Sequence, residues 1–168
     1  MRTNKLDRQI VARFLNNLSY KHELICRFGL ATGLRISDII QLTIDKVKIE
    51  KPTIKEMKTG KSKRIYIPKE LREELINYHK RYSNNEYIFY SESSASGHIS
   101  RQAVWKAFKR TAKKLNIKSN IAPHSTRKSY ACKLLRKGKN YTYIKNKLNH
   151  KSISDTILYL SDLLKLED

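Results

Sequence analysis

Residues 24–38 read LICRFGLATGLRISD, and this stretch decides the core of the fold. The run from Leu24 to Ala31 is apolar on nearly every face, which predicts a helix buried inside a domain. Gly33 follows at the position where many helices end in a left-handed residue. A short third helix is expected over residues 36–42. The domain is therefore expected to be built around a buried helix that a glycine terminates.

The segments on either side of this stretch have different periodicities. On the N-terminal side, apolar residues recur at helical spacing and predict an amphipathic first helix; they are Leu6, Ile10, Val11, Phe14, Leu15 and Leu18. On the C-terminal side, residues 47–49, 53–57 and 64–67 are short β-like runs. Lys58-Thr59-Gly60-Lys61 separates the last two runs and is typical of a hairpin turn. We therefore expect a small antiparallel three-stranded sheet.

The rest of the chain is predicted to be mostly helical. Further helices are expected over residues 69–82, 100–115, 123–136, 141–148 and 153–164, with a brief extended piece at 87–90 and a polar loop at 91–97. The chain has 168 residues, no internal repeat and no long linker, so one domain over residues 1–168 is expected. The predicted fold class is mainly α (α+β), a helical domain that carries one small sheet.

The charge of the chain is large and unevenly distributed. Lys and Arg number 36 against 15 Asp and Glu, a formal net charge of +21. Residues 93–154 contain 16 of the basic residues and no acidic residue, so this segment carries +16 of the +21. Such a field attracts a polyanion, and nucleic acid is the commonest one in a cytosol. A solvated basic surface and a membrane-surface patch are the alternatives.

Other features exclude several classes of protein. Cys26 and Cys132 lie in apolar-periodic stretches, and the polar start of the chain is no secretion signal, so we expect reduced core cysteines in a cytosolic protein. No apolar run approaches the ~18 residues that a membrane helix needs. No cluster of residues has the character of a metal site, and neither a metal nor another cofactor is expected. A secreted mini-protein, a zinc finger and a membrane protein are thus disfavoured.

Two pairs of residues are suited to bind phosphate. His124 and Arg127 lie three positions apart on a predicted helix and share one face. Arginine binds phosphate bidentately, and histidine exchanges a proton near neutral pH. Taken alone, a His-x-x-Arg pair is more often a surface pair than a site. Arg35 stands at a predicted helix start, which suits it only if an anion or a carboxylate lies nearby, and Asp38 could orient it.

Three further residues lack a strong signal of their own. Lys58 lies in the predicted hairpin turn, where most lysines are merely solvated. Ser152 and Asp155 have the spacing of a capping box, so a helix is predicted to begin just after Ser152. His150 then lies on the turn before this helix and Tyr159 about two turns inside it. A half-buried packing role is the default for any of the ten tyrosines.

Taken together, these residues resemble the tyrosine recombinase (phage integrase) family. The resemblance runs from about Asn4 to Leu164. Its motifs are Thr32-Gly33-Leu34-Arg35-Ile36-Ser37-Asp38, Lys58-Thr59-Gly60-Lys61 before the strand ending at Pro68, His124-Ser125-Thr126-Arg127, and Leu148-Asn149-His150 with Tyr159 nine residues on. Each motif is modest, but their order and spacing together are specific. Asn149 stands where glycine is usual in the family, a mild change because Asn tolerates left-handed backbone.

The resemblance implies a site-specific recombinase or integrase that cuts and rejoins double-stranded DNA through a covalent 3′-phosphotyrosine, for integration or excision of a phage or other mobile element. It assigns the following roles: Tyr159 as nucleophile, Arg35 and Arg127 as phosphate clamp, His150 as phosphate hydrogen-bond donor, His124 in proton transfer and Lys58 as general acid. Lys61, Lys63, Arg101 and Lys128 are predicted DNA contacts, and Asp38 a supporting residue. Self-association as a tetramer on DNA, accessory DNA-bending or directionality factors, and a location in the cytoplasm of a bacterial or phage-infected cell are expected.

Several alternatives stay open at this stage. The same residues also resemble type IB topoisomerase, which relaxes supercoils through an identical intermediate, and a catalytically silent DNA-binding domain is a third reading. The family's N-terminal core-binding domain is expected to be absent, since the first helix already belongs to the catalytic fold. In the tail, Leu160, Leu163, Leu164 and Leu166 could dock on a neighbouring subunit or pack on their own domain.

Overall fold

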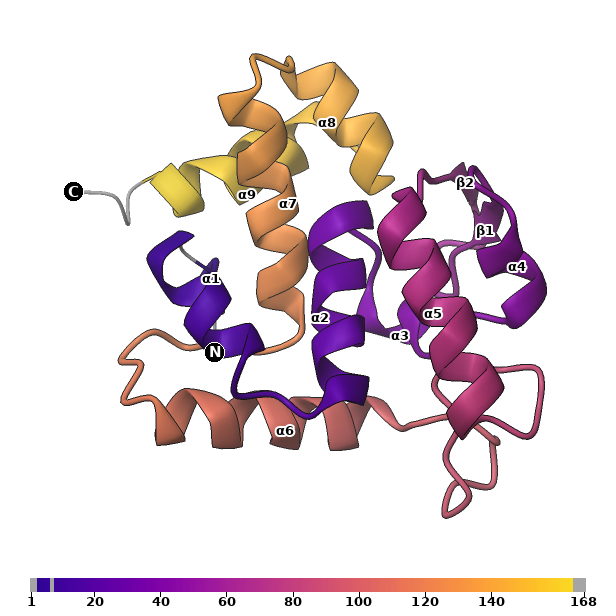
Figure 1. The fold of residues 1–168 in the computed structure, drawn as a ribbon. Coiled ribbons are helices and arrows are strands. Elements are labelled where there is room, and N and C mark those ends of the chain that lie inside the picture. Colours follow the sequence, from indigo (N-terminus) through magenta and orange to yellow (C-terminus); the bar gives the residue numbers. More distant parts are fainter. Residues whose placement is uncertain (1–2, 7, 165–168) are drawn as a thin grey trace.

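The computed structural model describes residues 3–6 and 8–164, and two helices lie side by side at its centre (Figure 1). These are α2 (Tyr20–Thr32) and α7 (His124–Arg136). They approach closely at Gly29, where an added Cβ would lie 2.4 Å from the Thr126 Oγ1. Helix α2 is buried along most of its length and ends at Gly33, whose φ of 64° is left-handed. The predictions of a buried helix and of its glycine end are confirmed.

The other helices surround this central pair. They are α1 (Arg8–Leu15), α3 (Ile36–Ile39), α4 (Ile44–Lys48), α5 (Lys69–Tyr82), α6 (Arg101–Lys114), α8 (Tyr141–Leu148) and α9 (Ile153–Leu164). In Figure 1, α6 runs below α2 and α7, while α8 and α9 lie together at the upper end of α7. The bounds of α5, α8 and α9 are those predicted from the sequence. The mainly helical class is confirmed.

The sheet has two strands rather than the three expected. Strands β1 (Thr53–Lys55) and β2 (Ser62–Arg64) pair antiparallel, with Thr53 opposite Arg64. Of residues 47–49, predicted as the third strand, Val47 and Lys48 instead form the end of α4, and Ile49 follows as its C-cap. The Val47 N–H bonds the Thr43 carbonyl in the manner of a helix, so this backbone is satisfied locally and needs no strand partner. A run of three residues is too short for its apolar pattern to show whether it forms a strand or a helical turn.

The apolar side chains form two clusters that meet along α7. The larger cluster is built from α1 to α6 and includes Phe14, Phe28 and Phe108. The smaller one joins α7, α8 and α9 and includes Ile144 and Leu160. Cys26 lies in the first cluster and Cys132 in the second, and both are buried free thiols, as predicted. The fold thus places α7 at a seam between two packed units.

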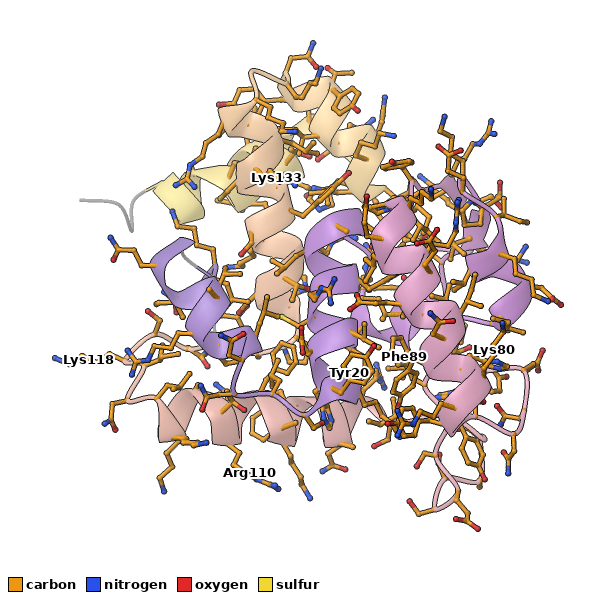
Figure 2. All side chains as sticks on the ribbon, in the orientation of Figure 1. Tyr20, Lys80, Phe89, Arg110, Lys118 and Lys133 are labelled. Carbon is orange, nitrogen blue, oxygen red and sulfur yellow. The ribbon has the colours of Figure 1, made fainter. Side chains whose placement is uncertain are left out.

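The basic segment of the chain covers much of the outer surface. Figure 2 shows Arg110 projecting from α6 away from the core and Lys118 on the loop that follows α6, and both side chains are exposed. Trp105 is also exposed on α6. Across the part of the chain that the structure describes, none of the helices combines the length and apolar character that a bilayer crossing requires.

Candidate active site

The Arg127 side chain lies at the seam and is held from both sides. It is only 1% exposed. Its Nη1 donates a 2.7 Å hydrogen bond to the Gly33 carbonyl, and its Nη2 donates to the Leu148 carbonyl. Burial and the positive charge of Arg35 lower the pKa of Arg127 to about 10, so the guanidinium stays charged at neutral pH. Two backbone carbonyls therefore fix a cation in the interior.

Arg35 immediately precedes α3 and finds its counter-charge on another element. Its Nη1 lies 2.7 Å from Oε2 of Glu56, which is fully buried. The sequence pointed to Asp38 as the carboxylate that orients Arg35, but Asp38 Oδ1 instead accepts a 3.0 Å hydrogen bond from the Met57 N–H. Asp38 thus ties α3 to the start of the turn that carries Lys58.

Glu56 is the residue of this site that sequence reasoning missed. Its Oε1 also lies 4.0 Å from Nη1 of Arg127, so the carboxylate stands between the two arginines. Burial by itself would raise the pKa of Glu56, but the charge of Arg35 and hydrogen bonding hold that pKa below its ordinary value. The sequence offered one signal that Glu56 faces inward, though none for its partner: Glu56 stands two positions after Ile54 in the expected strand, the spacing that places two side chains on one face, and both are buried.

Tyr159 lies two turns into α9 and faces two histidines. Its hydroxyl is 3.4 Å from Nε2 of His124, and the two rings meet edge to face with centroids 5.9 Å apart. The His150 ring also meets the Tyr159 ring edge to face, with centroids 5.2 Å apart. Nδ1 of His150 is 2.9 Å from the Thr156 hydroxyl, which fixes the orientation of that imidazole. Burial raises the pKa of Tyr159, and the charge of Arg127 opposes part of this shift.

Both histidines are neutral at pH 7 in the free protein. Loss of water around its ring and the charges of Arg127 and Lys128 lower the pKa of His124 to about 4. Burial and the charges of Arg127 and Arg35 likewise lower the pKa of His150 to about 4. A neutral imidazole can accept a proton from the Tyr159 hydroxyl.

The start of α9 is built as the sequence predicted. The Ser152 Oγ accepts a 3.0 Å hydrogen bond from the Asp155 N–H, and Asp155 Oδ2 accepts one of 3.0 Å from the Ser152 N–H. Just before it, Asn149 ends α8 with a φ of 51°. This is the left-handed geometry that glycine would adopt easily and that asparagine tolerates. Together these turns bend the chain so that His150 faces back towards Tyr159.

Leu160 packs on its own domain. It is 1% exposed and belongs to the smaller apolar cluster. Of the other tail residues named from the sequence, the side chains of Leu163 and Leu164 and all of Leu166 lie outside the described part of the chain.

Lys58 lies on the turn between β1 and β2, at the edge of an open groove. The groove has a volume of about 680 Å³, and Lys58, Arg35, His124 and Arg101 line it together with the polar residues Ser96 and Ser100. Lys58 is exposed, and among residues 3–6 and 8–164 no hydrogen bond or ion pair fixes its ammonium, which suits a side chain that must reach a ligand in the groove. The groove opens next to the arginines and histidines.

The four predicted DNA contacts divide into two pairs. Lys61 is exposed on the turn between β1 and β2, and Arg101 is exposed and lines the groove. Lys63 and Lys128 are buried: the Lys63 ammonium lies 3.5 Å from the Thr32 carbonyl, and Lys128 donates a 2.6 Å hydrogen bond to the Thr3 carbonyl. Since both ammonium groups point to backbone carbonyls, direct DNA contact is retained as a prediction only for Lys61 and Arg101. Within residues 3–6 and 8–164, no group of three or more His, Cys, Asp or Glu is placed to hold a metal ion.

Comparison with known proteins decides the family. A family model described as "Phage integrase family" matches residues 4–164. The chain belongs to the phage integrase family. Among its relatives, the tyrosine recombinase XerA of Pyrococcus furiosus is 32% identical over 143 residues, which is 83% of this chain and 49% of the relative. XerD of Staphylococcus haemolyticus is 30% identical over 152 residues, 85% of this chain and 50% of the relative. The chain thus spans about half the length of these relatives.

Solved structures of phage integrase family members share this fold. A crystal structure of XerA recombinase matches with a TM-score of 0.76 at 20% identity, covering 93% of this chain and 58% of that one. The catalytic domain of bacteriophage HP1 integrase matches with a TM-score of 0.72 at 22% identity, covering 95% of this chain and 88% of that one. The Tn1549 transposon integrase, solved in complex with circular intermediate DNA, has a TM-score of 0.77 at 19% identity. These likenesses show that the predicted fold is the observed one.

In this phage integrase family member, residues far apart in the sequence meet at one site. Arg35 comes from the loop after α2, Arg127 and His124 from the first turn of α7, His150 from the turn after α8 and Tyr159 from α9. Lys58 joins them across the groove that Arg35 and His124 also line. A tyrosine hydroxyl, two imidazoles and two guanidinium groups therefore lie together, and Arg35, His124 and Lys58 line the groove beside them.

Proposed function

We propose that this chain is the catalytic domain of a site-specific DNA recombinase, which cuts and rejoins double-stranded DNA through a covalent 3′-phosphotyrosine on Tyr159. The single observation that carries this proposal is the position of the Tyr159 hydroxyl, 3.4 Å from His124 Nε2 and within the electrostatic influence of the buried Arg127. The fold of the phage integrase family supports it. XerH, a structural neighbour, has been solved bound to its difH substrate in a post-cleavage complex.

The reaction conserves the energy of the phosphodiester. The Tyr159 oxygen attacks phosphorus, an O–P bond forms, and the bond between phosphorus and the DNA 5′ oxygen breaks. Negative charge grows on the non-bridging oxygens, where Arg35 and Arg127 are suited to stabilise it. In the reverse step a different DNA 5′-hydroxyl attacks the phosphotyrosine and Tyr159 regains its proton. Repetition on the partner strands passes through a Holliday junction.

Two groups carry the protons in this scheme. The tyrosine proton passes to Nε2 of His124, which is neutral and lies at the long end of hydrogen-bond distance in the free protein. A bound phosphate would counter the charges of Arg127 and Lys128 and so raise the pKa of His124, which strengthens it as a base. Lys58 gives a proton to the leaving 5′ oxygen from the other side of the groove.

The charge distribution supports DNA as the ligand. Residues 93–154 carry +16 and include α6, on which Arg101 lines the groove and Lys106 and Arg110 are exposed. We infer that duplex DNA follows this surface, with Lys61 contacting it on the opposite side of the groove. Assembly as a tetramer on DNA, accessory bending or directionality factors, and action in the cytoplasm of a bacterial or phage-infected cell belong to the same proposal.

The test is the covalent adduct itself. Purified protein would be incubated with a supercoiled plasmid carrying the DNA that flanks its gene, and SDS-resistant protein–DNA adducts would be measured for the wild type and Tyr159→Phe. Tyr143→Phe is the matched control, because it removes the hydroxyl of an exposed tyrosine on α8. An adduct in the wild type and in Tyr143→Phe, but not in Tyr159→Phe, is the expected result.

Other results would point to the other readings. An adduct that survives Tyr159→Phe would mean that another tyrosine is the nucleophile. Relaxation of plasmids of any sequence would favour a type IB topoisomerase activity. Salt-sensitive binding without any adduct would favour a silent DNA-binding domain.

A further inference from the structure

Glu56 is a fully buried carboxylate that the proposed reaction does not use. Its Oε2 lies 2.7 Å from Nη1 of Arg35, and its Oε1 lies 4.0 Å from Nη1 of Arg127. The two guanidinium groups that would clamp the phosphate are thus positioned around one acidic side chain. A buried ion pair by itself adds little to stability, because removing both charges from water offsets their attraction. A buried carboxylate at position 56 is better explained by its effect on the orientation of the neighbouring guanidinium groups.

The same carboxylate also holds the turn that carries Lys58. The Thr59 hydroxyl donates a 2.9 Å hydrogen bond to Glu56 Oε2, the oxygen that also contacts Arg35. The Gly60 N–H bonds the Glu56 carbonyl at 2.8 Å, and the Glu56 N–H bonds the Lys61 carbonyl at 3.0 Å. Both ends of the Lys58 loop are therefore fastened to one residue.

The geometry leaves the phosphate-binding capacity of the arginines free. Among the described residues, the only nitrogen of Arg35 that bonds Glu56 is Nη1. Arg127 uses its two Nη atoms on the Gly33 and Leu148 carbonyls, and its closest approach to Glu56 is longer than a hydrogen bond. Five N–H donors are present on each guanidinium, so donors remain for a phosphate in the groove. Glu56 sits behind the arginines without blocking them.

We propose that Glu56 is a positioning residue that links the Arg35 guanidinium to the Lys58 turn, so that the phosphate clamp and the proton donor act on the same phosphodiester. This inference rests on the proposed recombinase function. Asp38 supports the same turn from α3 by accepting the Met57 N–H, which leaves Glu56 as the direct bridge between Arg35 and the turn.

The test compares two leaving groups in single-turnover cleavage. A DNA substrate whose scissile 5′ oxygen is replaced by sulfur departs as a thiolate, which needs no proton from Lys58 because a thiol is far more acidic than an alcohol. On the normal substrate, Glu56→Gln should slow cleavage roughly 10- to 100-fold, the scale of a small misplacement of reacting groups. On the sulfur substrate part of this loss should be recovered. Recovery should be complete for Lys58→Ala and absent for Arg35→Ala.

Two further variants make the test decisive. Thr59→Val breaks the bond between carboxylate and turn without touching Arg35, so its smaller defect should be recovered fully on the sulfur substrate. Glu50→Gln is the matched control, since it removes one nearby negative charge from an exposed side chain and should cleave like the wild type. Thr59→Val also keeps the test valid if Glu56→Gln does not fold.

The possible outcomes separate this inference from the proposed function. If the wild type forms no Tyr159 adduct, the recombinase proposal itself fails. If the wild type cleaves and folded Glu56→Gln cleaves equally fast, the positioning role of Glu56 is overturned. If Glu56→Gln shows no recovery with sulfur and Thr59→Val has no defect, the link to the Lys58 turn is overturned.

Discussion

Arg127 donates a 2.7 Å hydrogen bond to the carbonyl of Gly33, so a guanidinium on α7 is fixed by the residue that ends α2. The second Arg127 bond, to the Leu148 carbonyl, reaches the end of α8. Two helix ends therefore supply the carbonyls that their own hydrogen-bond ladders leave unsatisfied. The arrangement positions the arginine and satisfies buried backbone at the same time.

Gly33 is predicted to be far more sensitive to substitution than a glycine of similar backbone geometry. A Cβ at Gly33 would lie 2.3 Å from the Tyr130 ring, whereas Gly138, with a φ of 70°, has open space around it. Gly138→Ala should cost about 1 kcal/mol for left-handed backbone alone. Gly33→Ala should cost roughly 1–3 kcal/mol more from overpacking and should also weaken adduct formation. Urea unfolding of both variants measures this, and equal losses would contradict it.

The cap of α9 is predicted to affect catalysis as well as stability. Ser152→Ala removes the acceptor of the Asp155 N–H and should cost about 1 kcal/mol. Asn140→Ala removes the equivalent cap of α8, where the side chain accepts from the Tyr143 N–H at 2.8 Å. Both should destabilise the protein similarly, but only Ser152→Ala loosens the helix that carries Tyr159. When the two variants are compared at the same folded fraction, adduct formation should fall more for Ser152→Ala than for Asn140→Ala. An equal fall would contradict a specific effect of the α9 cap on catalysis.

Lys63 is predicted to make stability rise with pH above neutrality. Burial, together with the charge of Arg127, lowers the pKa of Lys63 to about 7, against 10.5 for an unperturbed lysine. Between these values the unfolded chain binds more protons than the folded one, so the free energy of unfolding grows as pH rises from about 7 to about 10. Lys63→Met should remove this contribution and stabilise the protein most at and below pH 7. Denaturant unfolding at pH 6, 7, 8 and 9 compares the two, and parallel pH profiles would contradict the prediction.

The two histidines predict an acid limb for cleavage at low pH. With the pKa values of His124 and His150 lowered to about 4, cleavage at limiting DNA should stay level from pH 8 to pH 6 and fall only below about pH 5. An inflection near pH 6.5 would show unshifted histidines. His124→Asn should remove the part of the fall below pH 5 that comes from protonation of His124. It should also lower the cleavage rate at neutral pH on the order of 100-fold.

The same histidine shifts also act on folding, which the experiment must control. Below pH 6.5 the unfolded chain takes up protons that the folded protein resists, so stability falls as pH drops from 6.5 towards 4. Circular dichroism at each pH separates a loss of folded protein from a loss of cleavage by folded protein. Only the second counts for the assignment of His124.

Much of the fold followed from local sequence. Apolar periodicity located the helices, Gly33 marked the end of α2, and the Ser152–Asp155 spacing marked the start of α9. These features depend on interactions within a few residues, which is why a single sequence suffices to find them. The expected strand over residues 47–49 was wrong because a run as short as Val47, Lys48 and Ile49 also fits the end of a helix.

Local pattern and the family resemblance together were enough to name Arg35, Lys58, His124, Arg127, His150 and Tyr159. The carboxylate that meets Arg35 could be found only in the folded protein. Glu56 and Arg35 are 21 residues apart and come together only when the β1–β2 turn packs against the end of α2, so no local pattern could pair them. Tertiary packing likewise buried Lys63 and Lys128, which were predicted from the sequence as DNA contacts, because a side chain's burial depends on neighbours from distant segments.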